Sequence, residues 1–155
     1  MKDEKWLDPF ANDNTIKKIG FENVITNDLN PDFKCDYNLE ANTFLQLFSN
    51  DSIDGIVFDP PYSPTQLKRR YNSIGLKTST ELMRMSTWST WKDNIARVIK
   101  PGGHVISFCW NSAGIGKKRG FEIQYIFLLN HGSTHNDTII TIDLKINQKL
   151  KNFFD

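Results

Sequence analysis

Apolar residues gather in short runs that have the length of β-strands. Two runs in the middle of the chain, Ile53–Phe58 and His104–Trp110, are predominantly apolar, which is the pattern of strands buried on both faces of a parallel sheet. Four further runs predict strands at Trp6-Leu7, Asn23–Thr26, Glu122–Leu129 and Thr138–Lys145. The last two flank the turn signal His131-Gly132, so we expect them to pair as an antiparallel hairpin.

Between these runs the apolar spacing changes to that of helices. Two segments, Glu40–Phe48 and Thr80–Ile99, repeat apolar residues at steps of three and four. The second contains Trp88 and Trp91, which we expect to pack in the core. A shorter helix is predicted to end near Gly20. Strands that alternate with helices predict an α/β fold with a mostly parallel, doubly wound sheet, closed by the C-terminal hairpin.

The composition is that of one globular domain, and we expect residues 1–155 to form it. The 19 Lys and Arg nearly balance the 18 Asp and Glu, and this net charge of +1 excludes a polybasic mode of nucleic-acid binding. Cys35 and Cys109 lack the spacing of a zinc site or a disulfide framework. Since the sequence shows neither a signal peptide nor the roughly 18–20 apolar residues of a membrane span, we expect a cytoplasmic protein without a membrane partner.

Two histidines are spaced like a helical metal pair but lie in a different context. His131 and His135 stand four residues apart in the turn region between two predicted strands. No carboxylate or thiol pattern accompanies them there. We therefore expect no metal site.

Acidic residues follow three of the predicted strands. Asp8, Asp28 and Asp59 stand at these ends, and Trp110 closes a fourth strand. In open α/β sheets, ligands bind beyond the carboxyl ends of the strands, so we expect these loops to form the ligand site. An acid after the second strand commonly accepts hydrogen bonds from ribose hydroxyls, which favours a nucleoside ligand beside Asp28.

The most specific motif is Asp59-Pro60-Pro61-Tyr62, directly after a strand that we expect to be buried. Two prolines remove two backbone donors and fix φ near about −65°, so the loop is stiff and the Pro60 carbonyl is available as an acceptor. Asp59 supplies a second acceptor and Tyr62 a flat aromatic face. Two acceptors beside a stacking surface suit a planar ring that carries an amino group.

This tetrapeptide resembles the catalytic signature of the amino-methyltransferases that use S-adenosylmethionine, chiefly the DNA adenine-N6 enzymes. Other segments resemble that family in the same order: the start of a cofactor motif at Trp6–Ala11, the lead into the fifth strand at Ile99–Gly103, and the closing hairpin of small phage-encoded members at Glu122–Lys145. The resemblance covers nearly the whole chain. It implies a Rossmann-like methyltransferase fold, S-adenosylmethionine as cofactor, and a role in DNA methylation of the restriction–modification or phage kind.

The resemblance also implies the residues that hold the cofactor. These are Asp8, Pro9, Phe10, Ala11, Asn12, Asp28, Glu40, Ala41 and Asp59. Asp28 would bind the ribose, and Glu40-Ala41 would lie beside the adenine ring, although Glu40 also suits the first turn of a helix. Asn12-Asp13-Asn14 stands where the family has a glycine turn. Because Asn and Asp tolerate left-handed backbone better than other L-residues, we expect the turn to form; weaker cofactor binding is the alternative.

By the same resemblance, Asp59, Pro60, Pro61 and Tyr62 would hold a flipped-out adenine of DNA for direct methylation of its N6 amine. The aspartate at the head of the motif favours adenine over cytosine, because the cytosine-N4 relatives usually have serine there. Two alternatives stay open. One is an enzyme that methylates guanine N2 in ribosomal RNA, where a similar tetrapeptide occurs. The other is a catalytically inactive protein that binds cofactor or nucleic acid.

Two basic clusters are candidates for contacts with DNA phosphates. Lys68-Arg69-Arg70 follows the catalytic motif, and Lys117-Lys118-Arg119 follows the strand that ends at Trp110. We expect both at the same sheet edge as Asp59, although charge runs are also typical of solvated surfaces. No separate target-recognition domain fits in the chain. A homodimer or a partner subunit is therefore one expected source of sequence specificity.

Overall fold

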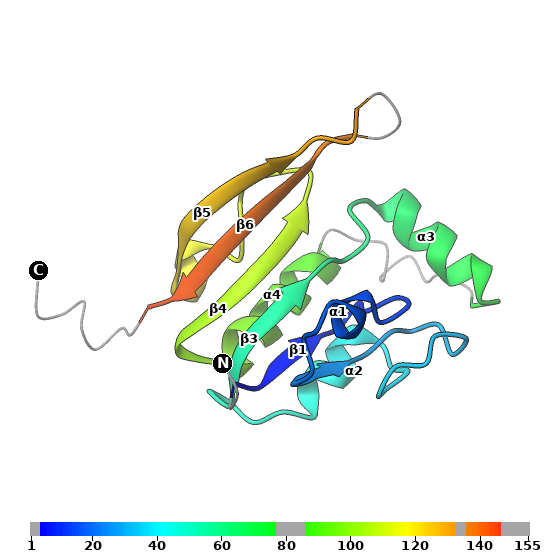
Figure 1. Cartoon of the computed structure of the whole chain (residues 1–155), viewed down its shortest axis with the longest axis horizontal. Helices are drawn as coiled ribbons and strands as arrows, with labels where there is room; N and C mark the ends of the chain where they lie inside the picture. The colour runs from blue at the N-terminus through cyan, green and yellow to red at the C-terminus, as the bar shows by residue number, and fades with distance from the viewer. Residues whose placement is uncertain (1–3, 77–85, 133–135, 147–155) are drawn as a thin grey trace, which may run out of the picture.

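The computed structural model describes residues 4–76, 86–132 and 136–146. Within these residues, six strands form one sheet in the order β2-β1-β3-β4-β6-β5 (Figure 1). The strands are β1 (Trp6–Asp8), β2 (Val24–Thr26), β3 (Ile53–Phe58), β4 (Ile99–Cys109), β5 (Phe121–Leu129) and β6 (Thr138–Lys145). The first four run parallel, and β6 is antiparallel to both β4 and β5. The predicted mostly parallel sheet with a closing antiparallel hairpin is confirmed.

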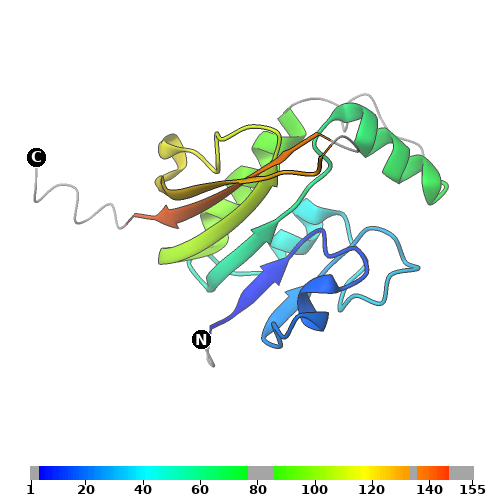
Figure 2. The same cartoon turned by 45° about the horizontal axis from the view of Figure 1, so that its top comes forward.

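The helices lie in the connections between strands. They are α1 (Thr15–Lys18), α2 (Ala41–Gln46), α3 (Pro64–Ser73) and α4 (Ser86–Val98), with a 3₁₀ turn η1 (Lys117–Arg119) before β5. Since β2 and β4 lie on opposite sides of the β1–β3 pair, right-handed crossovers place α1 on one face of the sheet and α2 and α4 on the other (Figures 1 and 2).

The apolar core lies between the sheet and the two helices on its better-covered face. Leu7, Ile56 and Val105 of the central strands are fully buried, as are Phe44 of α2 and Trp91 of α4. The expected packing role of Trp91 is thereby confirmed. On the opposite face α1 has only four residues, so it covers little of the sheet.

Two elements, α3 and β4, differ clearly from the predictions. Helix α3 was not expected, because only Leu67 and Tyr71 of its residues are buried, but Ser63 accepts a hydrogen bond from the Gln66 N–H as its N-cap and Pro64 begins its first turn. The predicted start of a strand at His104 is wrong, since β4 begins at Ile99 and a register shift absorbs the following Pro-Gly-Gly. Helix α4 agrees with the second half of its predicted range; residues 80–85 of that range lie outside the described residues.

Candidate functional site

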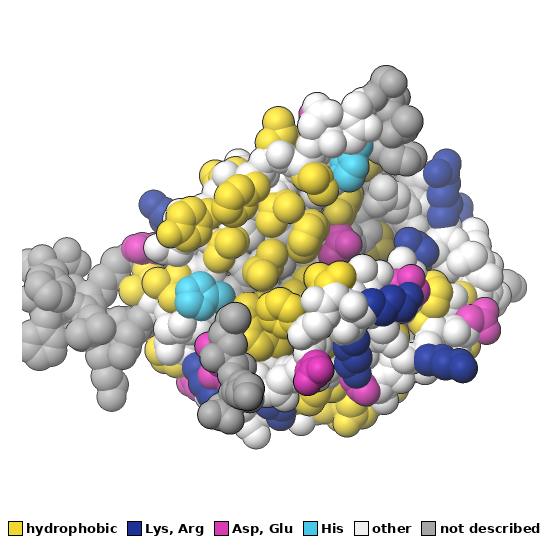
Figure 3. Space-filling view, in the orientation of Figure 1, with side chains coloured by type: hydrophobic (Ala, Val, Ile, Leu, Met, Phe, Trp, Pro, Cys, Tyr) yellow, Lys and Arg dark blue, Asp and Glu magenta, His cyan; other side chains and the backbone are white. Residues whose placement is uncertain are grey.

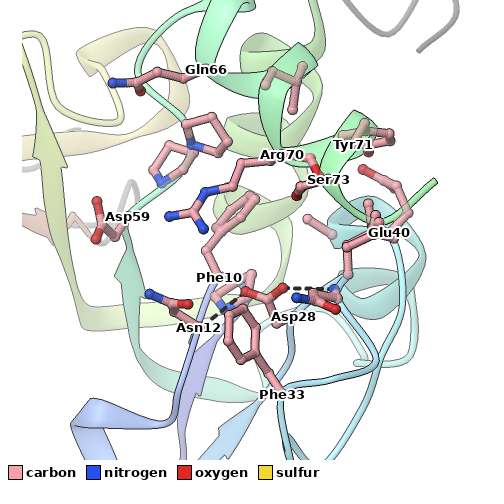
Figure 4. Close-up of a pocket in the computed structure, with 18 of the residues that line it drawn as sticks. Phe10, Asn12, Asp28, Phe33, Glu40, Asp59, Gln66, Arg70, Tyr71 and Ser73 are labelled. Carbon is pink, nitrogen blue, oxygen red and sulfur yellow. Dashed lines mark hydrogen bonds between the residues drawn. The ribbon is translucent and has the colours of Figure 1, made fainter. Parts of the chain in front are cut away.

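The loops at the carboxyl edge of the parallel strands surround one cavity, as the topology rule predicts. Its volume is about 590 Å³, within the range of small-molecule sites. Helix α3 closes it from the side opposite the β1 and β2 loops (Figure 4). Of the predicted site residues, the cavity is lined by Pro9, Phe10, Asn12, Asp28, Glu40, Ala41, Asp59, Pro60, Pro61, Tyr62, Arg69 and Arg70.

The loop after β1 turns through asparagines in left-handed conformation. Asn12 has φ 51° and Asn14 has φ 61°, the backbone region that glycine adopts without strain. The Ala11 N–H donates to the Asn27 carbonyl at 2.9 Å, and the Asn12 N–H donates to Oδ2 of Asp28 at 3.0 Å. The prediction that this turn forms without glycine is confirmed. Asp8 and Ala11 are both buried, and neither is among the residues that line the cavity.

Asn27 joins the loops that carry the site, a role that the sequence analysis missed. Its buried side-chain amide donates to the carbonyls of Pro9 and Leu39, both at 3.0 Å. Its side-chain oxygen accepts from the Leu39 N–H at 2.9 Å. The available signal was a polar residue directly after an apolar strand, because a buried amide must satisfy its hydrogen bonds and therefore ties down the loops around it.

Asp28 presents an organised carboxylate to the cavity. One oxygen accepts from the Asn12 N–H at 3.0 Å and the other from the Asn30 N–H at 2.8 Å. Two backbone donors fix the orientation of the carboxylate and leave further lone pairs on each oxygen. The side chain is therefore positioned to accept hydrogen bonds from a ligand that carries neighbouring hydroxyls.

Glu40 is the N-cap of α2, so its carboxylate has a structural role at the start of the helix, close to the one that the sequence suggested. Its Oε2 accepts from the N–H groups of Asn42 at 2.7 Å and Thr43 at 3.3 Å. Its Oε1 accepts from the indole N–H of Trp91 at 3.0 Å. Glu40 and Ala41 still form part of the cavity wall, so the carboxylate serves the fold while the wall remains available to a ligand.

The Asp59-Pro60-Pro61-Tyr62 loop leaves β3 at the mouth of the cavity. The Tyr62 hydroxyl donates to Oδ1 of Asp59 at 2.7 Å, and the Trp88 indole N–H donates to the Pro61 carbonyl at 2.9 Å. Within the described residues, the Pro60 carbonyl has no hydrogen-bond partner. The Pro60 carbonyl and the neighbouring Asp59 carboxylate can therefore both accept hydrogen bonds from a ligand, as the motif predicts.

Two further residues shape this loop. The Tyr62 N–H donates to the side-chain oxygen of Gln66 in α3 at 2.6 Å. The Tyr62 ring meets Trp110 edge to face, with centroids 5.5 Å apart.

Trp88 was expected only to pack; its hydrogen bond to the Pro61 carbonyl adds a positioning role. Spacing along the helix shows which residues share a face, but not that one of them reaches a loop 27 residues away.

The acids of the site have raised pKa values. Burial raises the pKa of Asp8 to about 7, with smaller contributions from the charges of Asp59 and Asp28, against a backbone hydrogen bond from Phe10. Asp59 is accessible at the mouth, but the surrounding walls remove enough water to raise its pKa, despite the Tyr62 hydroxyl and the charge of Arg70. Burial and the adjacent carboxylate also raise the pKa of Tyr62. A proton is thus held more tightly here than on ordinary carboxylates.

The first basic cluster lies on the wall of the cavity. Arg70 extends from α3 across Phe10 toward Asp59 (Figure 4). Arg69 also lines the cavity, whereas Lys68 is exposed and does not. Among the described residues, none of the three forms an ion pair. The expected location of this cluster, beside Asp59, is confirmed for the two arginines.

The expected location of the second basic cluster is wrong. After β4 the chain returns along the sheet before β5 begins, so Lys117, Lys118 and Arg119 precede Phe121, which pairs with Lys145 near the start of β4. Arg119 forms an ion pair with Asp93 at 2.6 Å and donates to Ser89. A loop that follows a parallel strand in sequence need not stay at its carboxyl end when the next strand is also parallel to it.

The described residues carry neither a membrane-spanning helix nor a cluster of metal ligands. No helix among residues 4–76, 86–132 and 136–146 is long and apolar enough to cross a bilayer. In the same ranges, no three His, Cys, Asp or Glu side chains gather as ligands for a metal ion. His135 lies outside these residues.

Comparisons with known proteins identify the fold. No protein-family model and no curated protein matched the sequence. Among solved structures, the N-methyltransferase NodS from Bradyrhizobium japonicum is similar with a TM-score of 0.66 and 12% identity, over 93% of this chain and 86% of that one. A SAM-dependent methyltransferase from Methanosarcina mazei gives 0.64 and 13%, over 96% and 95%. A putative methylase from Haemophilus influenzae gives 0.61 and 11%, over 93% and 80%. The chain therefore has the Rossmann-like fold of these methyltransferases.

Proposed function

We propose that this protein transfers a methyl group from S-adenosylmethionine to the exocyclic N6 amine of adenine in DNA. The observation that carries the proposal is the Asp59-Pro60-Pro61-Tyr62 loop, whose residues line the cavity that the β1 and β2 loops share. The similar solved structures support the donor, since one of them, NodS, was crystallised with S-adenosylhomocysteine. The identity of the accepting base rests on the motif.

The residues of the cavity fit this cofactor. Asp28 offers fixed carboxylate oxygens to two ribose hydroxyls. Leu29, Leu39 and Ala41 offer apolar surface to a flat ring. When bound, the cofactor supplies a methyl group on a sulfonium, a good electrophile whose sulfur leaves as a neutral thioether.

Asp59 and Pro60 prepare the nucleophile. The lone pair of an adenine amine is delocalised into the ring, which makes the amine a poor nucleophile. Two hydrogen bonds, from the NH₂ group to the Asp59 carboxylate and to the Pro60 carbonyl, favour a more tetrahedral nitrogen and aim its lone pair at the methyl group. Acceptors that are already oriented before the reaction need no reorganisation during it.

Tyr62 has two tasks in this mechanism. Its ring is the stacking surface for the flipped base, a contact worth roughly 1–3 kcal/mol. Its hydroxyl holds Oδ1 of Asp59 and leaves Oδ2 for the amine. After transfer the methylated nitrogen carries a positive charge and loses a proton. Asp59 is the acceptor at hand for that proton, and the desolvation that raises its pKa favours this step.

Arg69 and Arg70 are the groups that we assign to the phosphates beside the flipped base. They lie on the cavity wall without ion-pair partners among the described residues, so binding a phosphate breaks no existing pair. Lys117, Lys118 and Arg119 lie elsewhere and have no part in the proposal. The near-neutral charge of the whole chain makes such local contacts the main source of electrostatic affinity.

The proposal is tested by expression in a host strain without adenine methylation. We expect N6-methyladenine in the DNA of this strain, measured by mass spectrometry of nucleosides, and none when Asp59→Ala is expressed instead. S-adenosylmethionine is expected to raise the melting temperature of both purified proteins, because Asp59 is not the residue that binds the ribose. No modified base in DNA, with methylguanine in ribosomal RNA, would favour the RNA alternative. No modified base at all, with no thermal shift, would reject both enzymes.

A further inference from the structure

Strand β5 is an edge strand with apolar side chains exposed on both of its faces. Among the described strands, it pairs with β6 alone. Tyr125 is 62% exposed, Ile126 56% and Leu128 66%, and alternate residues of a strand point to opposite faces. Ile123, Phe127 and Leu129 are exposed as well. Figure 3 shows hydrophobic side chains gathered over this end of the sheet. The exposure of these residues shows that no described segment covers them.

The sequence of β5 lacks most of the features that keep edge strands apart. Natural edges are commonly protected by lysine, proline, short length or bulges. β5 has nine residues, no proline and no basic residue, and its one charged residue is Glu122, near the start. A register shift between Ile123 and Tyr125 is its only irregularity. Such a strand retains open backbone donors and acceptors along an apolar surface.

We propose that β5 pairs with β5 of a second copy of this chain, antiparallel and around a two-fold axis that passes beside Ile126. The two six-stranded sheets then form one continuous sheet. In this register Ile126 faces its own counterpart, Tyr125 faces Phe127 of the other copy, and Glu122 faces Asn130. An isologous contact of this kind closes on itself and gives a dimer, not a fibre.

Charge and side-chain pairing favour this arrangement over others. A parallel pairing places the two Glu122 carboxylates side by side, whereas the antiparallel register sets each beside a neutral amide. Cross-strand pairs of aromatic side chains stabilise antiparallel sheets by about 0.2–1 kcal/mol each, and the register contains two Tyr125–Phe127 pairs. A nucleic acid needs cations to replace its counterions, and β5 offers none.

The available area suits a weak dimer. The exposed apolar residues of β5 present on the order of 600 Å² per copy, given the size of aliphatic and aromatic side chains. Edge-to-edge pairing covers only the flanks of these side chains, because they stand perpendicular to the sheet, so the buried area lies below the roughly 1,200–2,000 Å² of stable specific interfaces. We therefore expect a dissociation constant in the micromolar range, which makes the dimer visible at about 1–100 μM protein.

The first test is the oligomeric state of the full chain by sedimentation velocity over this concentration range. We expect a concentration-dependent dimer for the natural sequence and a monomer for Ile126→Lys, because its charge meets its own copy at the axis. Ile19→Lys is the matched control: Ile19 is 73% exposed, lies far along the chain from β5, and is expected to leave the dimer intact. Far-UV circular dichroism checks that both variants fold.

The second test measures the register and does not depend on a destabilising change. Ile126→Cys is expected to form a cross-linked dimer with a short bifunctional maleimide, because the two residues lie about 5 Å apart in an antiparallel pair. Leu128→Cys is the control, since the two copies of that residue lie roughly 14 Å apart. The unaltered protein reports any reaction of Cys35 and Cys109. A natural sequence that stays monomeric at about 100 μM, a dimer that survives Ile126→Lys, or equal cross-linking at both positions overturns the proposal.

Discussion

The two ends of β3 carry aspartates in opposite environments. At the start of the strand, Asp54 forms an ion pair with Lys100 at 2.7 Å and accepts from the Lys5 N–H at 2.8 Å, and these contacts lower its pKa. At the other end, Asp59 has only the Tyr62 hydroxyl as a hydrogen-bond donor among the described residues, and its pKa is raised. The same residue type is thus paired at one end and available at the other.

The basic residues follow the same division. Arg119 is paired with Asp93, and Lys145 with Asp51 at 2.7 Å near the start of β4. Arg70, on the wall of the cavity, forms no ion pair within the described residues. Exposed ion pairs contribute little to stability, whereas an unpaired charge beside a cavity is free to bind a ligand. The pairing of charged side chains, and not their residue type, therefore distinguishes the end of the sheet that carries the cavity from the opposite end.

Exchange of each aspartate for alanine tests this division most strongly. We expect Asp59→Ala to lower the methylation rate by about 100- to 1,000-fold, because it removes an oriented group from the transition state. Asp54→Ala is expected to stay within about twofold in activity and to lose at most about 1 kcal/mol of stability. Single-turnover methylation of an adenine-containing duplex and urea denaturation measure the two effects. Equal losses of activity in the two variants contradict the division.

The pH dependence of stability distinguishes the two kinds of acid. The folded-state pKa of Asp8, about 7, lies above the ordinary value of 3.8, so ionisation of this buried group costs stability as the pH rises from about 4 to 7. We expect Asp8→Asn to stabilise the protein by on the order of 4 kcal/mol at pH 8 and to have little effect near pH 4. Asp54 has a lowered pKa, so Asp54→Asn is expected to destabilise at pH 8 and to lose this effect as the pH falls.

Urea denaturation of both asparagine variants at several pH values measures these free energies of unfolding. The two variants are expected to deviate from the natural protein in opposite directions at pH 8 and to converge toward it in acid. A stabilisation by Asp8→Asn that is the same at pH 4 and pH 8 would show that repacking, and not the charge, is responsible.

Alanine variants of Arg70 and Arg119 test whether the two basic clusters differ in DNA binding. We expect Arg70→Ala to weaken DNA binding by about tenfold and to reduce the salt dependence by about one released counterion. Arg119→Ala is expected to bind DNA normally and to lose about 1 kcal/mol or less of stability, through the contact with Asp93. Lys68→Ala, on the same helix as Arg70 but away from the cavity, is the matched control. Fluorescence anisotropy at several salt concentrations is the measurement; equal loss of affinity in Arg70→Ala and Arg119→Ala opposes the assignment.

Removal of the Tyr62 hydroxyl has the smallest expected effect. The hydroxyl stabilises the ionised form of Asp59, so Tyr62→Phe is expected to raise the pKa of Asp59 further. Because methylation needs the carboxylate, the acidic limb of the pH–rate profile then moves to higher pH, while the rate at the optimum changes by about twofold to tenfold. A profile that keeps its acidic limb in place shows that the limb reports another group.

The sequence alone predicted the edge of the sheet at which the cavity lies because its signals are local. Proline fixes its own backbone, an apolar run marks the strand before it, and the acids at the carboxyl ends of β1, β2 and β3 stand close to these runs in the chain. The left-handed backbone of Asn12 and Asn14 was predictable for the same reason, because the tolerance of asparagine for positive φ is a property of the residue itself. The fold class, the cavity edge and most of its lining residues were therefore accessible from the sequence.

Only the tertiary structure decided which charges are paired and which strand lies at the edge. The position of Arg119 depends on the return of the chain between β4 and β5, and the hydrogen bonds of Asn27 and Trp88 cross long stretches of sequence. The apolar pattern of β5 suits a buried central strand as well as an edge. Its exposure follows from the insertion of β6 between β4 and β5, because strand order is set by packing between distant segments and not by the residues of any one strand.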